Sequence, residues 1–207
     1  LELGNAVFTE FQGELGQHTT LDQRVIDMGA GLERFAWITM GTPTAYDCCF
    51  GPINEKLYNT IGIDSDSEVL RKYFTEIAKE IDHYEDLNEV RRLAIKNAGI
   101  TDSQLTKMIT PMEGMYLIAD HLRTLIFAIT DGALPSNVGG GYNLRIMLRR
   151  IISTMNRLEL LFDLNEIIDK QIDYLKNTYP ELEDTREDVK EIIQIETKRY
   201  DTSKQRM

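Results

Sequence analysis

The sequence predicts an α+β fold that is mostly α-helical, in which a small antiparallel β segment is followed by a helical domain. Three observations support this prediction. β-prone residues alternate near the start, apolar residues recur with a helical period from Gly31 onward, and no apolar run approaches the roughly 20 residues needed to cross a bilayer. With 42% hydrophobic and 28% charged residues, the 207-residue chain has a globular composition, which excludes wholesale disorder.

Two strands are expected at residues 6–11 and 20–26, with a turn over residues 13–16. Two strands alone make a poor free-standing sheet. We therefore expect them to be the remnant of a larger domain, and the chain to be an internal fragment of a longer protein. Residues 1–45 are assigned to the C-terminal part of that domain, and residues 46–207 to a helical domain that is incomplete at its C-terminus.

The change to a helical period begins after Gly31, and glycines, prolines and cap-forming side chains divide the rest of the chain into helices. A break is expected at Pro111, because proline lacks an N–H and its ring clashes with the preceding turn. The expected helices cover residues 32–39, 46–61, a segment after the cap-rich residues 64–68, 86–97, a segment after residues 101–104, 112–130, 142–160, 165–177 and 181–205, with a loop over residues 131–141.

Charge is unevenly distributed along the chain. The net charge of −11 argues against general binding to nucleic acid. Between Gly132 and Leu158, however, there is no Asp or Glu, and the only charged residues are arginines. A basic segment in an acidic chain is more informative than the total charge, because it marks a local surface. The four arginines are Arg145, Arg149, Arg150 and Arg157.

Cysteine and histidine usage bounds the compartment and the metal chemistry. Cys48 and Cys49 are adjacent, so they form neither a disulfide framework nor a zinc site. The three histidines lack metal-ligand spacing, and no metal ligands are assigned. The first residues have no basic or apolar signal region. We expect a cytoplasmic protein with no membrane partner.

Residues 27–34, Asp-Met-Gly-Ala-Gly-Leu-Glu-Arg, lead from the second expected strand into the first helix. Glycines let the backbone approach a ligand, and the N-terminus of a helix favours an anion. Arg34 could bind a phosphate, and Asp27 could hold an ammonium group. The alternative interpretation is an ordinary strand-to-helix turn with a surface arginine.

Five segments, in order, resemble the alanyl-tRNA synthetase family of class II aminoacyl-tRNA synthetases, in its archaeal form. Residues 27–34 are similar to the third class II motif. The most specific segment, residues 131–145, resembles the family pattern Asp-Gly-x-x-Pro-Ser-Asn-x-x-x-Gly-Tyr-x-Leu-Arg. The other three are Glu-Leu-Gly-Asn-Ala-Val-Phe at residues 2–8, Gly-Thr-Pro-Thr-Ala-Tyr-Asp at 41–47 and Ala-Asp-His-Leu-Arg at 119–123.

This resemblance implies an amino-acid and ATP pocket in the first part of the chain. Asn5 and Asp27 would hold alanine, with backbone at Val7 and Gly29 lining the pocket. Arg34, with the backbone of Gly29 and Gly31, would bind ATP. Asp27 and Arg34 are the expected catalytic residues, because they would position the alanine carboxylate for attack on the α-phosphate. ATP is expected to bring Mg²⁺.

The resemblance also implies recognition of the acceptor stem of tRNA-Ala. Asn137 would contact its G·U wobble pair, which an A-form stem exposes in the minor groove. A row of arginines follows on the next helix: Arg149 comes four residues after Arg145, and Arg157 comes eight residues after Arg149. With Arg150 beside it, this row would contact phosphates. The alternative interpretation is a loop in which Ser136 or Asn137 caps the helix N-terminus, with a solvated arginine face.

The main hypothesis is a fragment of an alanine–tRNA ligase that is inactive when isolated, since the resemblance places a second ATP-binding motif before residue 1. The zinc motif of the family's editing domain is likewise not found in the sequence. The runner-up is a non-catalytic helical RNA-binding module, and a third option is a purely structural interaction domain. Asn5 and Asp27 discriminate the first hypothesis from the second, because an RNA-binding module needs no ammonium pocket.

Overall fold

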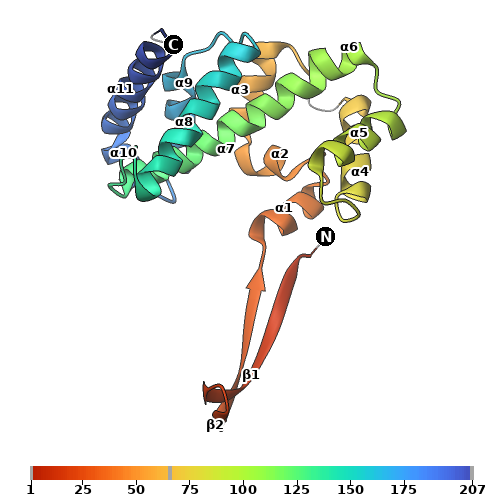
Figure 1. Cartoon of the computed structure of the whole chain (residues 1–207), viewed down its shortest axis with the longest axis vertical. Coiled ribbons are helices and arrows are strands. Elements are labelled where there is room, and N and C mark those ends of the chain that lie inside the picture. The colour runs from red at the N-terminus through yellow and green to blue at the C-terminus, as the bar shows by residue number, and fades with distance from the viewer. Residues whose placement is uncertain (1, 65–66, 206–207) are drawn as a thin grey trace. The chain divides into compact units, whose positions relative to one another are not determined.

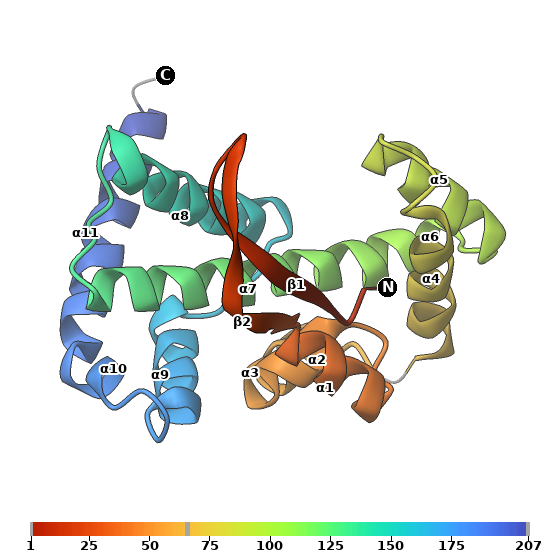
Figure 2. The same cartoon turned by 90° about the horizontal axis from the view of Figure 1, so that it is seen from below.

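The computed structural model describes residues 2–64 and 67–205 (Figures 1 and 2). By its internal contacts the chain divides into two compact units, Leu1–Cys49 and Phe50–Met207. The first unit contains the β segment, and the second is helical, as Figure 1 shows by colour. The predicted mostly helical fold with a small antiparallel sheet is confirmed. The functional boundary expected after residue 45 stays a prediction.

The first unit is built on an antiparallel ribbon of β1 (Gly4–Glu14) and β2 (Gln17–Ala30). Both strands are longer than predicted, because pairing continues on either side of an irregularity between Thr9 and Phe11. The turn between them contains Gly16, whose φ of 86° lies in the region that favours glycine. At its other end β2 continues to Ala30, so the ribbon reaches into the glycine-rich turn, residues 27–34.

Helix α1 (Leu32–Met40) follows the ribbon after Gly31 alone. It ends at Gly41, where φ is 63° and the N–H donates to the carbonyl of Trp37 at 2.9 Å. This left-handed glycine is a common way to end a helix, and it confirms the stop predicted here. Helix α2 (Ala45–Phe50) begins where the Asp47 carboxylate accepts hydrogen bonds from the backbone N–H and hydroxyl of Thr44.

The second unit is a set of helices joined by short connections. Their bounds are α3 (Pro52–Ile61), α4 (Glu68–Glu80), α5 (Leu87–Asn97), α6 (Asp102–Gln104), the π-helix η1 (Leu105–Ile109), α7 (Thr110–Thr130), α8 (Gly139–Arg157), α9 (Leu164–Leu175), α10 (Glu181–Asp184) and α11 (Arg186–Gln205). Within the described residues, none of these helices is long and apolar enough to cross a membrane.

Helix α7 forms the centre of the second unit. Figure 2 shows it running across the unit, with α8 on one side and α3 and α9 on the other. Ile118, Leu122 and Leu125 have no exposed surface, and burial of such side chains contributes roughly 1.5–3 kcal/mol each. Gly114 allows α8 to approach closely, because a Cβ there would lie 2.4 Å from a methyl carbon of Leu158. The core therefore fixes the direction of α8.

Several predicted boundaries are wrong. The helix expected over residues 46–61 is divided at Gly51, and the one over 181–205 at Thr185. Helix α8 begins at Gly139, three residues earlier than expected. No break occurs at Pro111, because the helical run from Asp102 to Thr130 continues through η1. A π-turn is wider than an α-turn, and this one directly precedes the proline.

Candidate functional site

Four predicted pocket residues lie together on one face of the ribbon. In the antiparallel register Asn5 pairs with Gly29, and Val7 pairs with Asp27. Residues directly opposite each other share a face, as do residues two apart on one strand. All four are exposed within their unit. The pocket residues that are 22 positions apart along the chain, Asn5 and Asp27, are thus neighbours across the ribbon.

The opposite face of the same ribbon is apolar. Ala6 pairs with Met28, and Phe8 pairs with Ile26. Phe8 is 71% exposed, and Met28 is 68% exposed. At this end of the ribbon, Asn5, Asp27 and Gly29 thus lie on the face opposite to Phe8, Ile26 and Met28.

The glycine-rich turn brings Arg34 to the same end of the ribbon. The N–H of Gly31 donates to the carbonyl of Leu3 at 3.0 Å, which closes the ribbon just before α1. Arg34 donates from its guanidinium to the carbonyl of Glu2 at 2.5 Å. The Glu2 carboxylate in turn accepts from the Asn5 amide at 3.1 Å. These contacts join the first residues of β1 to the first turn of α1.

This end of the ribbon has the groups that an amino acid and a nucleotide require. Asp27 supplies a carboxylate, which can pair with an ammonium group. The N-cap residue of α1 is Gly31, which has no side chain to cap the helix, and the first N–H groups of a helix have no partner within it. Those groups and Arg34 can bind a phosphate. A Cβ at Gly29 would lie 3.1 Å from the side-chain oxygen of Asn5, so glycine keeps this face open.

The second candidate site is the loop before α8. Pro135 is buried and Asn137 is exposed. The N–H of Ser136 donates to the carbonyl of Gly141 at 2.9 Å, which folds the loop onto the first turn of the helix. A Cβ at Gly141 would lie 2.4 Å from the carbonyl oxygen of Leu134 and from the Ser136 hydroxyl. The loop can approach α8 this closely only because residue 141 is glycine.

Arg145 does not share the exposed surface of the other arginines. Its side chain is 14% exposed and forms an ion pair with Glu196 of α11, which is 7% exposed. Two hydrogen bonds of 2.9 and 3.0 Å make this pair bidentate. Arg145 also donates to the carbonyl of Pro135 at 3.2 Å and to the side-chain oxygen of Asn137. Its role in contacting RNA phosphates stays a prediction that this geometry does not favour.

Glu196 remains charged in this setting. Burial alone raises the pKa of its carboxyl group, but the hydrogen bonds from Arg145 and Arg199 outweigh burial and bring the pKa below its ordinary value. Arg199 donates to the same carboxylate from the next turn of α11. Two cations thus stabilise one nearly buried anion.

The remaining arginines of α8 face solvent. Arg149, Arg150 and Arg157 are exposed, while Leu148 and Ile151 on the other side of the helix are buried. Among the described residues, Arg149 and Arg150 have no ion pair or hydrogen bond to another side chain, which leaves their charges available to a ligand.

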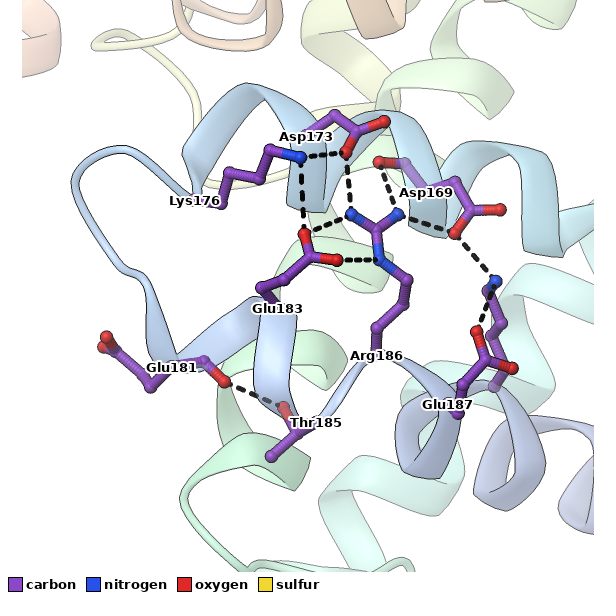
Figure 3. A network of polar contacts seen from close by, with 9 residues as sticks. Asp169, Asp173, Lys176, Glu181, Glu183, Thr185, Arg186 and Glu187 are labelled. Carbon is purple, nitrogen blue, oxygen red and sulfur yellow. Dashed lines mark hydrogen bonds and ion pairs between the residues drawn. The ribbon is translucent and has the colours of Figure 1, made fainter.

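A second polar network joins α9, α10 and α11 (Figure 3). Arg186 is 15% exposed and pairs with Asp169 at 2.8 Å, Asp173 at 2.7 Å and Glu183 at 2.6 Å. Burial opposes the ionisation of Asp169, but hydrogen bonds from Lys190 and Arg186 outweigh it and lower its pKa. This network ties the start of α11 to α9 and α10.

The described residues contain no group of three or more His, Cys, Asp or Glu side chains that could hold a metal ion. Cys48 and Cys49 are half-buried, with their sulfur atoms 3.8 Å apart. The thiol of Cys48 contacts the carbonyl of Ala45 at 3.1 Å, one turn earlier in α2. The adjacent cysteines are accounted for by local packing.

Residues 1–206 match the family described as "tRNA synthetases class II (A)", and the chain belongs to that family. This agrees with the ribbon, the glycine-rich turn and the helical unit described above.

The chain is similar, in particular, to archaeal proteins named "Alanine--tRNA ligase". It is 79% identical to the protein of Nitrosopumilus maritimus and 62% identical to that of Cenarchaeum symbiosum, each over all of its length and 23% of theirs. It is 39% identical to the protein of Methanothermobacter thermautotrophicus over 97% of its length and 22% of that relative's. The chain thus spans less than a quarter of these curated relatives.

Proposed function

We propose that the chain is the part of an alanine–tRNA ligase that supplies one side of the amino-acid and ATP pocket together with the surface that recognises the acceptor stem of tRNA-Ala. The single observation behind the pocket is the register of the ribbon. It places Asn5, Val7, Asp27 and Gly29 on one face, next to the uncapped N-terminus of α1 and Arg34. The identity of 79% to a protein of that name supports the choice of amino acid.

In this proposal the ribbon and α1 position the two substrates of the first reaction. Asp27 pairs with the ammonium group of alanine, and the Asn5 amide orients it. Arg34 and the N-terminus of α1 bind ATP so that the alanine carboxylate attacks the α-phosphate in line. Mg²⁺ bound to ATP would share the phosphate charge. A ligase of this kind works in the cytoplasm.

Recognition of the tRNA is divided between a base contact and phosphate contacts. Asn137 is exposed at the loop and reads the edge of the wobble pair in the shallow minor groove of the stem. Arg149, Arg150 and Arg157 on the exposed side of α8 bind phosphates, which position the protein but specify no sequence. A non-catalytic RNA-binding module would use the same helix but would have no use for Asp27.

The test compares Asn137→Ala with Arg149→Ala in the intact ligase. Asn137→Ala should abolish discrimination between stems with a G·U and a G·C pair, since a base-edge contact contributes roughly 1–3 kcal/mol. Arg149→Ala should weaken both stems equally and reduce the salt slope by less than about one unit. Binding is measured on filters at two salt concentrations, and unchanged discrimination in Asn137→Ala would refute the base contact.

A further inference from the structure

The guanidinium of Arg145 is held by groups from three parts of the second unit. Its own backbone belongs to α8, the bidentate pair is with Glu196 of α11, and its remaining contacts are with Pro135 and Asn137 of the loop. Arg145 and Glu196 are 51 positions apart in the chain. With 14% of its side chain exposed and its donors directed at these groups, Arg145 has little capacity left for an RNA phosphate.

This arrangement determines which way the Asn137 amide points. A guanidinium has only N–H donors and no acceptor. The atom of Asn137 that faces it must therefore be the amide oxygen, Oδ1, and not the NH₂ group. Because Asn137 is exposed, the NH₂ group is left to face solvent. An amide that is free to turn can present either its oxygen or its NH₂ group to a ligand, whereas this one has its oxygen turned toward Arg145 and its NH₂ group directed away from it.

We propose that Arg145 is a positioning residue for base-pair recognition: clamped by Glu196, it fixes Asn137 so that the loop presents hydrogen-bond donors to acceptor atoms at the minor-groove edge. This inference rests on the proposed function, in which Asn137 contacts the wobble pair. The acceptors available at that edge are purine N3 and pyrimidine O2. Glu196 takes part through Arg145 and does not itself contact RNA.

The buried carboxylate explains why a loop residue can be held so firmly. A buried cation without a partner is strongly unfavourable, and the bidentate geometry restricts the guanidinium to one plane. Arg199 provides a second donor to Glu196, so the carboxylate is also held from within its own helix. A lysine at position 145 would keep the charge but could not reach all three partners, because an ammonium group is a point charge on a flexible stem.

The experiment uses the intact ligase and measures charging of stem-loops that carry a G·U or a G·C pair. Arg145→Lys should lower the G·U over G·C preference about tenfold, the size of a base contact. The matched control is Arg186→Lys. Arg186 is equally enclosed, at 15% exposure, but its partners are carboxylates of α9 and α10 (Figure 3). It should lower the melting temperature and leave the preference within about twofold, the scatter expected for independent sites.

A double variant separates positioning from a general structural effect. In Asn137→Ala, the further change Arg145→Lys should not alter the preference, because residues that act as one unit are non-additive. Alanine-dependent ATP–pyrophosphate exchange checks that each variant is folded. If Arg145→Lys fails that check, Glu196→Gln replaces it, since the neutral amide weakens the pair while keeping its shape. A uniform loss of charging for both stems, with the preference unchanged, would overturn the inference.

The direction of the amide is tested with altered stems. 3-Deazaguanosine removes the N3 acceptor of the wobble guanosine, 2-thiouridine weakens the O2 acceptor of its partner, and inosine removes the 2-amino donor. Asn137→Ala should cancel the effect of at least one acceptor change and leave the effect of inosine intact. The opposite pattern contradicts the inference alone. If Asn137→Ala has no effect on the G·U preference at all, the proposed function itself fails.

Discussion

At the scale of single residues, Asp27 presents a carboxylate that no neighbouring side chain neutralises among the described residues. It lies across the ribbon from Val7, on the face that also contains Asn5, and no described side chain forms an ion pair with it. An exposed carboxylate of this kind gives the fold little stability. Its proposed value lies in binding, where a charge-assisted hydrogen bond to an ammonium group contributes roughly 1.5–3 kcal/mol.

In the intact ligase, Asp27→Ala should lower kcat/KM for alanine about ten- to a hundredfold, which corresponds to that energy. The KM for ATP should change far less. The measurement is ATP–pyrophosphate exchange at varied alanine and varied ATP. Asp22→Ala is the control, because Asp22 is also an exposed aspartate of β2 and should have no effect. Normal alanine kinetics in Asp27→Ala would remove Asp27 from the pocket.

At the scale of elements, two neighbouring glycines in the first turn of α8 differ sharply in what surrounds them. A Cβ at Gly140 would meet nothing within 4 Å, whereas one at Gly141 would lie 2.4 Å from the Leu134 carbonyl oxygen. Gly140→Ala should raise the free energy of unfolding by roughly 0.4–1 kcal/mol, because it restricts the unfolded chain. Gly141→Ala should lower it by roughly 1–3 kcal/mol through overpacking.

Gly141→Ala should also weaken G·U preference, since it displaces the loop that contains Asn137. Urea unfolding measures the stability of both variants, and charging of the two stems measures the preference. If both glycine variants were equally stable and equally selective, the close approach of the loop to α8 would be wrong.

The sequence predicts the helical faces of the second unit better than its boundaries. The helical period directs Met115, Leu117, Ile118 and Leu122 of α7 inward. Met115, Ile118 and Leu122 are buried, whereas Leu117 is half-buried, because a periodic pattern reports on one face and is least accurate at its edge. The break expected at Pro111 is wrong because a single π-turn absorbs the change in geometry, and no residue pattern marks such a turn. The break at Thr185 is likewise not marked by any change in the spacing of apolar residues.

The candidate sites divide in the same way. The register at the turn, in which Phe11 pairs with Thr20, would set Asn5 opposite Ile26, and only the irregularity between Thr9 and Phe11 brings Asn5 opposite Gly29. Asn5 and Asp27 could therefore be placed together only through the family resemblance. The pair of Arg145 with Glu196 could not, because it joins residues 51 positions apart. Helical spacing put Arg145 in one row with Arg149 and Arg157, and only tertiary packing shows that it is enclosed. Glu196 and Arg186 lay in an acidic stretch without a distinguishing signal.

At the scale of the whole molecule, the two units differ in how much apolar core each one contains. The helical unit has a continuous apolar core, in which Ile126, Ile151 and Ile168 have no exposed surface. In the first unit Asn5, Asp27 and Arg34 are all exposed within their unit. Activation of a carboxylate needs groups that are preorganised and shielded from water. A two-stranded ribbon followed by short helices gives little shielding.

The 207-residue chain on its own should therefore give no alanine-dependent ATP–pyrophosphate exchange above background. Arg34→Ala is the control that distinguishes real activity from a contaminant. Exchange that is present in the chain and lost in Arg34→Ala would contradict the prediction, because it would show that these residues suffice. The intact ligase, assayed under the same conditions, should show exchange.

The pairing of Arg145 with Glu196 also sets an order of events during synthesis. Residue 196 leaves the ribosome 51 residues after residue 145, which takes roughly 3 to 10 s at about 5–20 residues per second. Until then the guanidinium has no carboxylate, and the loop before α8 has no anchor. In stalled nascent chains, hydrogen exchange at the Ser136 amide should slow only once residue 196 has emerged. Slow exchange in a chain stalled earlier would mean that the loop orders itself during translation.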